Sequence, residues 1–159
     1  MKPNFRRTLA AAALLVAACA APAQPASARI ATQVAQADAG IVSNPEYEKA
    51  GQIAANAWLL LLDRQDWGTA WDASSAVFRE NVPLNAWMDN VPRLRDPFGN
   101  FVERDAGQAV YKKTLGNRQG DFVTVIFDSK FSKKPAVVET VTTVREPDGR
   151  WRVTGYTAR

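Results

Sequence analysis

Three charged side chains, Glu139, Arg95 and Arg104, are the residues of this sequence best suited to chemistry at a protected site. Glu139 lies two positions after Val137 and two before Val141 in the β-branched run AVVETVTTVRE. Because side chains alternate between the faces of a strand, Glu139 shares its face with neighbouring valines and is expected to point inward. A buried carboxylate needs a cation, a hydrogen-bond donor or a watery pocket, since burying an unpaired charge is costly. Arg93, Arg95 and Arg104 are the available cations.

Two interpretations of this group of residues follow. In the structural one, Glu139 pairs with Arg95 or Arg104 as a strut. In the functional one, Arg95, Arg104 and Glu139 line a ligand-binding cavity for a polar or anionic molecule, because guanidinium forks suit carboxylates and phosphates. The strut is favoured, since structural ion pairs imitate sites.

The absence of histidine removes several kinds of catalysis. Ser-His-Asp and Cys-His nucleophiles, histidine zinc sites and histidine bases are all excluded. The segment GNRQGD at 116–121 lacks the strand–loop–helix setting of a phosphate loop and predicts a turn. We therefore expect no catalytic residue, no metal site and no cofactor. The enzymatic alternative is a small isomerase or hydrolase in which burial raises the pKa of Glu139 to make it a base.

The N-terminus predicts an export signal over residues 1–28. Lys2, Arg6 and Arg7 form a basic segment, and the apolar run Leu9–Ala18 is too short to span a bilayer as a mature helix. The predicted location is therefore periplasmic or secreted.

Two processing routes remain open for this signal. Small residues before Ala28 suit a signal peptidase, and Ala23 ends a second candidate cleavage sequence. The string Val16-Ala17-Ala18-Cys19 resembles a bacterial lipobox, in which the cysteine becomes the lipidated first residue. Cleavage at Ala28 is favoured, because alanine-rich segments produce such strings by chance. Lipidation of Cys19, the one cysteine of the chain, would anchor the protein to the membrane.

Charge and partners follow from this assignment. The chain has 20 Lys and Arg against 16 Asp and Glu, and removing Lys2, Arg6 and Arg7 leaves 17 against 16. The remaining lysine pairs are isolated, so nucleic acid is not an expected partner. We expect a small molecule or another envelope protein instead, and a membrane only if Cys19 is lipidated.

One folded domain is expected over residues 45–159, after a tether at 29–44 that shows no sustained hydrophobic period. Three helices should begin it. Ser43 or Asn44 can cap the first, and Pro45 suits its first turn. Asp66 can cap the second, and the third is expected to end or kink near Pro92.

Trp67 and Trp71 lie one turn apart in the expected second helix. Such a pair could stack against sugars. Core packing is the favoured interpretation, because aromatic residues at helical spacing usually face the interior.

From Phe98 onward the sequence consists of β-branched and aromatic runs. The clearest is DFVTVIFDSKF, in which alternate positions form an apolar face: Val123, Val125, Phe127 and Phe131. The predicted fold class is α+β, with three N-terminal helices packed on one face of a curved antiparallel sheet of about four strands.

The last hairpin sets which side chains face the helices. Pro147 cannot donate a ladder hydrogen bond, so a three-residue loop with Gly149 left-handed is expected. This loop pairs Arg145 with Trp151 and Val141 with Gly155.

The same register predicts that Trp151 and Glu139 share the inner face, with Arg152, Thr154 and Tyr156 on the outer one. If the preceding loop also has three residues, Ser129 lies opposite Glu139.

The features now assembled resemble a family of exported bacterial proteins, domain of unknown function 4019. The strings that carry the resemblance are WLLLLDRQDWGTAWDASSAVF, RDPFGNFVERD, VVETV and DGRWRVTGY, between about Trp58 and Tyr156. Positions matching the family pattern are Arg95, Arg104, Glu139, Trp151, Gly155 and Tyr156. The resemblance implies export but no chemistry. The order of helices and strands also resembles nuclear-transport-factor-2-like and cystatin-like folds, whose curved sheet can leave a conical pocket.

These observations together predict an exported envelope domain that binds a small molecule or a protein partner without catalysis. The alternatives are the small enzyme with Glu139 as base and a purely structural or interaction module at the membrane surface, in which the outward Arg152, Thr154 and Tyr156 matter most.

Overall fold

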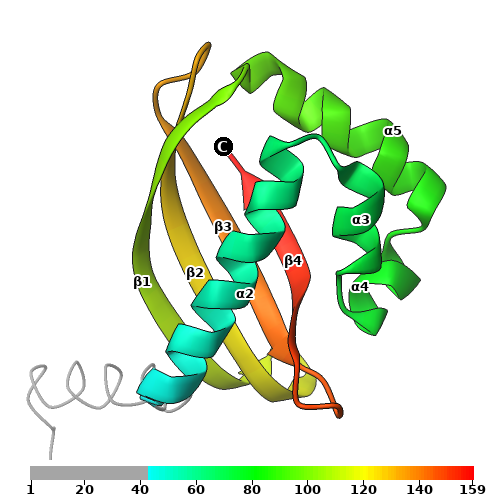
Figure 1. Ribbon diagram of the computed structural model, residues 1–159. Coiled ribbons are helices and arrows are strands. Elements are labelled where there is room, and N and C mark those ends of the chain that lie inside the picture. The colour runs from blue at the N-terminus through cyan, green and yellow to red at the C-terminus, as the bar shows by residue number, and fades with distance from the viewer. Residues whose placement is uncertain (1–42) are drawn as a thin grey trace, which may run out of the picture. The chain divides into compact units, whose positions relative to one another are not determined.

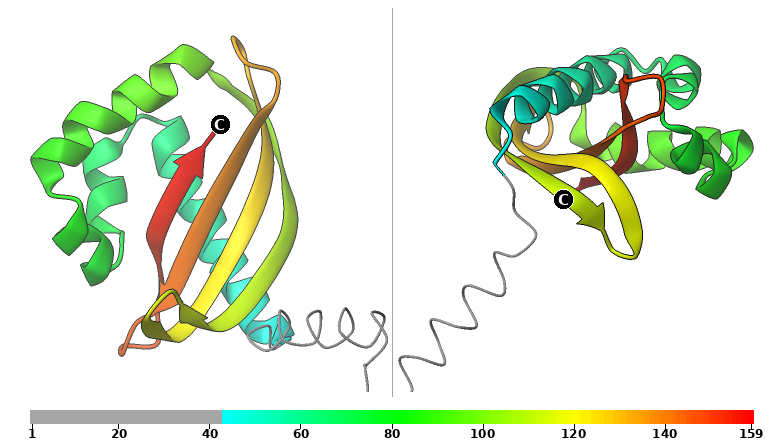
Figure 2. Two further views of the ribbon diagram at one scale, coloured as in Figure 1. Left: turned by 180° about the vertical axis from the view of Figure 1, so that it is seen from behind. Right: turned by 90° about the horizontal axis from the view of Figure 1, so that it is seen from below.

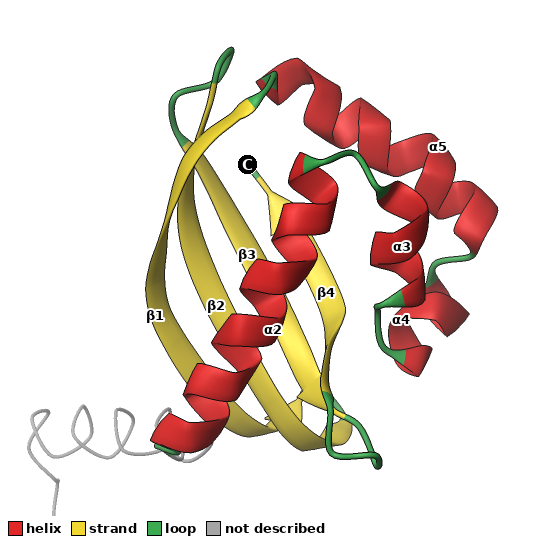
Figure 3. Ribbon diagram, viewed as in Figure 1, coloured by secondary structure: helices red, strands yellow, loops and turns green. Residues whose placement is uncertain are grey.

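The computed structural model describes residues 43–159. The predicted export signal, Cys19 and most of the tether lie outside these residues. The described part contains four α-helices and a short 3-10 helix, followed by a four-stranded antiparallel sheet (Figures 1 and 3). This arrangement confirms the predicted α+β class.

Helix α2 (Pro45–Asp63) crosses the concave face of the sheet and contacts all four strands (Figure 1). Its start is as predicted, because the Asn44 side chain accepts a hydrogen bond from the Tyr47 amide at 3.1 Å. The helix lies close against the sheet at Gly51, where an added β-carbon would lie 2.5 Å from that of Val123. The face opposite Gly51 is open, with Ile53 60% exposed, although the dense run of apolar residues from Ala54 to Leu62 would predict a mostly buried helix.

The C-terminus of α2 is closed by a Schellman motif. The Gln65 amide donates to the Leu62 carbonyl at 3.0 Å and the Asp66 amide to the Leu61 carbonyl at 2.9 Å. Gln65 has a φ of 59°, and it is the one non-glycine residue with positive φ among residues 43–159. A side chain in this left-handed region costs about 1–2 kcal/mol, which glycine avoids.

Replacing Gln65 with glycine is therefore expected to raise the free energy of unfolding by roughly 0.5–1 kcal/mol. The matched control is Gln52→Gly within α2, which should lower it by about 1 kcal/mol, because glycine is a poor residue in a helix interior. Urea denaturation of the three proteins measures both effects. Destabilisation by Gln65→Gly would mean that its side chain makes a stabilising contact.

The expected second helix is in fact two, α3 (Trp67–Asp72) and α4 (Ala76–Asn81). The break follows from Ser75, whose hydroxyl accepts from the Phe78 amide at 3.1 Å and caps α4. The Ser75 amide donates to the Val153 carbonyl of the sheet at 2.8 Å. The chain therefore leaves the helical path to bind the edge of the last strand.

Helix α5 (Leu84–Arg95) continues through Pro92, where we had expected an end or a kink. Proline removes one helical hydrogen bond, and the last turn nevertheless persists because Val91 and Arg95 are both buried. A 3-10 turn, η1 (Asp96–Phe98), then leads into the sheet. The final turn of α5 places Arg95 in the interior.

The sheet is a meander in the order β1 (Phe101–Leu115), β2 (Arg118–Phe131), β3 (Val137–Arg145) and β4 (Trp151–Ala158). The predicted apolar face of β2 is confirmed, since Val123, Val125, Phe127 and Phe131 are all buried. Seen from behind, no helix of residues 43–159 lies across the outer face (Figure 2). The inner face therefore carries the core.

The last hairpin turns as predicted. The Glu146 amide donates to the Arg150 carbonyl at 2.9 Å, the Gly149 amide donates to the Glu146 carbonyl at 2.8 Å, and Gly149 has a φ of 80°. Arg145 pairs with Trp151. Trp151 packs against Tyr47 of α2 with ring centroids 5.5 Å apart, so it faces inward.

The predicted register fails beyond Val153. Thr143 pairs with Val153 but Thr142 pairs with Gly155, so β4 carries one extra residue, a β-bulge. Val141 consequently lies opposite Tyr156 rather than Gly155, and Tyr156 turns to the inner face, where we had placed it outside.

The β2–β3 connection also differs from the prediction. Phe127 pairs with Glu139, and Ser129 pairs with Val137. The loop is longer than three residues, and the resulting shift of two residues leaves every side chain on its predicted face.

Candidate functional site

Four charged side chains meet on the inner face of the sheet: Asp63, Arg95, Arg104 and Glu139, here called the charge quartet. Each comes from a different element. Asp63 ends α2, Arg95 ends α5, Arg104 lies on β1 and Glu139 on β3. The quartet therefore joins two helices to two strands of the sheet.

The quartet forms a closed ring of alternating charge. Arg95 donates to Glu139 and Asp63 at 2.5 Å each, through Nη1 and Nη2. Arg104 donates to Asp63 Oδ2 at 2.8 Å through Nη1 and to Glu139 Oε2 at 2.7 Å through Nη2. Arg104 Nη2 also donates to Asp63 Oδ1 at 3.0 Å. Each guanidinium thus binds both carboxylates, which are charge-assisted hydrogen bonds of the stronger kind.

Two hydroxyl groups complete the shell around Glu139. Ser129 Oγ donates to Oε2 at 2.5 Å, and the Tyr156 hydroxyl donates to Oε1 at 2.7 Å. Arg95 Nη1 in turn donates to the Tyr156 hydroxyl at 2.8 Å. The inward turn of Tyr156 created by the β4 bulge is what makes these last two bonds possible.

The quartet is buried. The Glu139 side chain is 0% exposed, and the Asp63 side chain is 7% exposed. Within residues 43–159, no buried side-chain nitrogen or oxygen lacks a hydrogen-bond partner. Two cations balance two anions, so the desolvation cost of each charge is offset by its neighbours.

The contacts of the quartet fix its protonation. Burial by itself raises the pKa of Glu139, but the charges of Arg95 and Arg104 and the hydroxyl donors outweigh it and hold that pKa below its ordinary value. Burial and the charge of Glu139 raise the pKa of Tyr156. Glu139 therefore stays ionised and Tyr156 stays a donor at neutral pH.

The structure brings all three predicted site residues, Arg95, Arg104 and Glu139, into contact. Arg93, the third candidate cation, is exposed. The ion-pair interpretation of these residues describes their contacts well, since each guanidinium fork is occupied by carboxylates of the chain itself.

Sequence reasoning missed Asp63 and misplaced Tyr156. A signal for Asp63 was available, because it follows Leu59 by four positions and Leu62 by one, and so continues the buried stripe of α2. A signal for Tyr156 was also available, because the isolated Gly155 lies at the bulge and a glycine within a strand often marks one.

A hollow of about 400 Å³ opens beside the quartet, and Asp63 and Arg95 form part of its lining. Its other walls come from the turn after α2, the end of α5, the start of β1 and the end of β2, and they include Gln65, Trp67, Asp96, Asn100, Phe101, Phe131, Ser132 and Lys133. The volume falls in the range of small-molecule sites, roughly 300–1,000 Å³.

Metal and membrane features were sought in the same part of the chain. Residues 43–159 contain no group of three or more Asp, Glu, His or Cys side chains arranged to hold a metal ion. No helix among them is sufficiently long and apolar to span a membrane.

The family model for proteins of unknown function DUF4019 matches residues 54–156. The chain belongs to this family. The matched DUF4019 region contains the whole quartet together with Ser129 and Tyr156, and it ends at Tyr156 itself. No curated protein matches the sequence.

Proposed function

We propose that this DUF4019 protein is an exported, non-catalytic domain that binds a small polar molecule in the hollow beside the charge quartet. The observation that carries the proposal is the hollow itself, about 400 Å³ in volume, with Asp63 and Arg95 in its lining. Polar groups that converge on a preformed concavity are the usual features of a small-molecule site.

Gln65 gives this proposal independent support. It lines the hollow and occupies a left-handed backbone position that glycine would fill at lower cost. Non-glycine residues with strained backbone conformations of this kind cluster at ligand sites, where the strain can be part of the function.

The enzymatic alternative receives less support from the geometry. A general base needs a raised pKa and access to substrate. Glu139 has a lowered pKa, is 0% exposed and already accepts hydrogen bonds from Arg95, Arg104, Ser129 and Tyr156. A carboxylate in this setting suits a structural role. We therefore propose binding, rather than catalysis by Glu139, as the function of the adjacent hollow.

Export rests on the sequence alone. The basic and apolar segments of residues 1–28 support a secreted or periplasmic location, and the string ending at Cys19 supports lipid anchorage as the alternative. Mass spectrometry of the mature N-terminus distinguishes the two routes by the first residue and by the mass of a lipid.

Native mass spectrometry of the protein purified from the organism that encodes it tests the binding function. We expect a small molecule to copurify with the natural protein and to be lost from Asn100→Trp, because Asn100 lines the hollow and its side chain makes no hydrogen bond within residues 43–159. The matched control is Asn56→Trp on the exposed side of α2, which should retain the molecule. A ligand retained equally by both variants would place the binding site elsewhere.

A further inference from the structure

Asp63 and Arg95 form the side of the hollow next to the quartet, here called its floor. This floor carries no net charge. Arg95 contacts both Asp63 and Glu139, and Arg104 contacts the same two carboxylates. Because the two carboxylates already neutralise the two guanidinium charges, an anionic ligand would gain little net attraction and would lie beside the Asp63 carboxylate. The carboxylate or phosphate ligand considered from the sequence is therefore poorly matched to this floor.

The floor nevertheless keeps unused hydrogen-bonding capacity. A guanidinium has five N–H groups, and the bonds of Arg95 to Glu139, Tyr156 and Asp63 use Nη1 fully and Nη2 once. The Nε–H and one Nη2–H have no partner among residues 43–159. Asp63 accepts two hydrogen bonds at Oδ1 and one at Oδ2, so Oδ2 can accept another. Asp63 and Arg95, which are in contact with each other, both line the hollow, so a residue with a free acceptor lies beside one with free donors.

A hydroxyl group matches such a pair, because it both donates and accepts. It can donate to Asp63 Oδ2 and accept from Arg95 without bringing any charge. The walls add further neutral groups of the same kind, namely the amides of Gln65 and Asn100 and the hydroxyl of Ser132. The two other charged side chains of the lining, Asp96 and Lys133, are of opposite sign.

Aromatic side chains supply the apolar part of the lining. Trp67, Phe101 and Phe131 all border the hollow, and Trp67 and Phe101 are only partly buried. An aromatic surface beside polar groups suits a ligand whose ring has both C–H faces and hydroxyl edges. Trp67 belongs to the tryptophan pair for which sugar stacking had been one interpretation.

We propose that the hollow binds a neutral polyhydroxylated molecule, a sugar residue, with hydroxyl groups bridging Asp63 and Arg95. This inference rests on the proposed function, and it names the ligand class of the same site.

Two-dimensional NMR titration of the purified protein tests the ligand class. The neutral probes are glucose and N-acetylglucosamine, and the matched anionic probes are glucose 6-phosphate and glucuronate. We expect a neutral sugar to shift the amide resonances of Gln65, Asn100 and Ser132, with at least tenfold tighter binding than the anionic sugars.

Variants connect that binding to the lining. Asn100→Ala and Gln65→Ala should each weaken the neutral sugar by about fivefold or more, the loss of one hydrogen bond of about 1 kcal/mol. Asn56→Ala, remote from the hollow, should leave the affinity unchanged. Circular dichroism of each variant confirms that it is folded.

Three results would overturn the inference. Tighter binding of the anionic sugars at the same resonances would assign the site to an anion and leave the proposed binding function intact. Shifts confined to residues outside the hollow would reject the site as the sugar site. No shift with any of the four probes at tens of millimolar would reject a sugar ligand, while the copurification experiment still decides whether the hollow binds another small molecule.

Discussion

Replacing Glu139 with glutamine is expected to lower the free energy of unfolding by about 3–5 kcal/mol, because it leaves Arg95 and Arg104 buried with one carboxylate between them. Glutamine keeps the volume of the side chain, so the loss reports charge and hydrogen bonding rather than a cavity. Equilibrium unfolding in urea, followed by tryptophan fluorescence, measures the effect.

The control for this variant is Glu103→Gln. Glu103 pairs with Lys130 at 3.2 Å, but the two side chains are 64% and 50% exposed. Exposed pairs contribute less than about 1 kcal/mol, so this variant should unfold close to the natural protein. Similar stability losses for both variants would show that the burial of the quartet has no special consequence.

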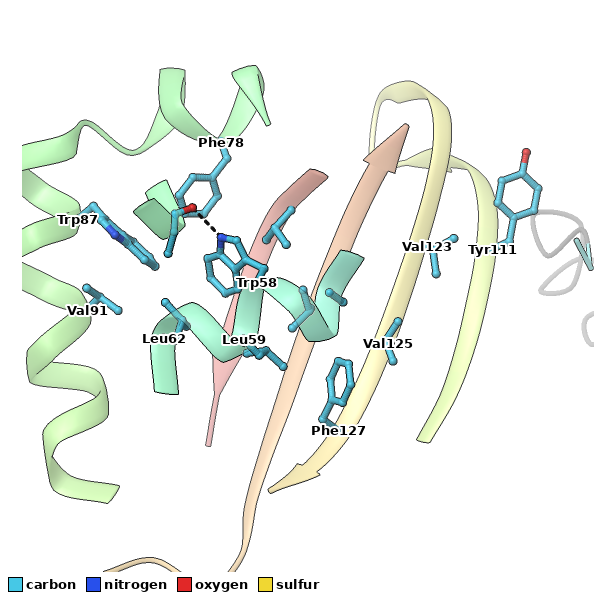
Figure 4. Close-up of a cluster of buried hydrophobic side chains, with 14 residues drawn as sticks. Trp58, Leu59, Leu62, Phe78, Trp87, Val91, Tyr111, Val123, Val125 and Phe127 are labelled. Carbon is cyan, nitrogen blue, oxygen red and sulfur yellow. Dashed lines mark hydrogen bonds between the residues drawn. The ribbon is translucent and has the colours of Figure 1, made fainter. Parts of the chain in front are cut away.

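Replacing Trp58 with alanine is expected to have an effect of the same size, a loss of about 3–5 kcal/mol. Trp58 is 3% exposed and packs against Phe78 and Trp87 (Figure 4). Its ring also contacts that of Tyr156, with centroids 5.3 Å apart. Its indole N–H also donates to the Ala70 carbonyl at 2.8 Å and to Ser74 Oγ at 3.0 Å. Truncation therefore removes both packing and the link between α2 and α3.

Two further variants separate these contributions and are measured by the same urea denaturation. Trp58→Phe keeps much of the apolar volume and should recover about half of the loss. Ile53→Ala removes a side chain that is 60% exposed on the same helix and should change stability by less than about 1 kcal/mol. A loss below about 1 kcal/mol for Trp58→Ala would contradict a central role for this indole in the core.

The sequence was sufficient to predict the α+β class, the start of α2 and the turn of the last hairpin, because each depends on local chemistry. Asn44 is a helix cap and Pro147 lacks an N–H, whatever surrounds them. The inward position of Glu139 also followed from simple alternation along β3. These features carried the prediction that Glu139 would meet Arg95 or Arg104.

The remaining features depend on contacts that no short segment encodes. The break at Ser75 exists because its amide binds the edge of β4. The last turn of α5 survives Pro92 because Val91 and Arg95 are buried by other elements. The bulge in β4 turns Tyr156 inward, and the isolated Gly155 is its one mark in the sequence. At Ser75 and Pro92, tertiary packing decided the outcome against the local signal.

The quartet and the hollow share two residues. Asp63 and Arg95 belong to both, so the ion pairs that hold α2 and α5 on the sheet also fix the donor and acceptor that face the hollow. A rigid, neutral floor of this kind favours a pre-organised binding site, because its groups need not be ordered when a ligand binds. Loss of the quartet is therefore expected to affect both stability and binding.

A double-mutant cycle of Glu139→Gln and Arg104→Met tests the quartet most directly, with unfolding free energies measured for the natural protein, both single variants and the double variant. Each single change leaves a buried charged partner without its counterion. The loss of unfolding free energy in the double variant should therefore be smaller than the sum of the two single losses, by at least about 2 kcal/mol. Additive losses, within about 0.5 kcal/mol, would show that the two side chains act independently and would contradict a closed charge quartet.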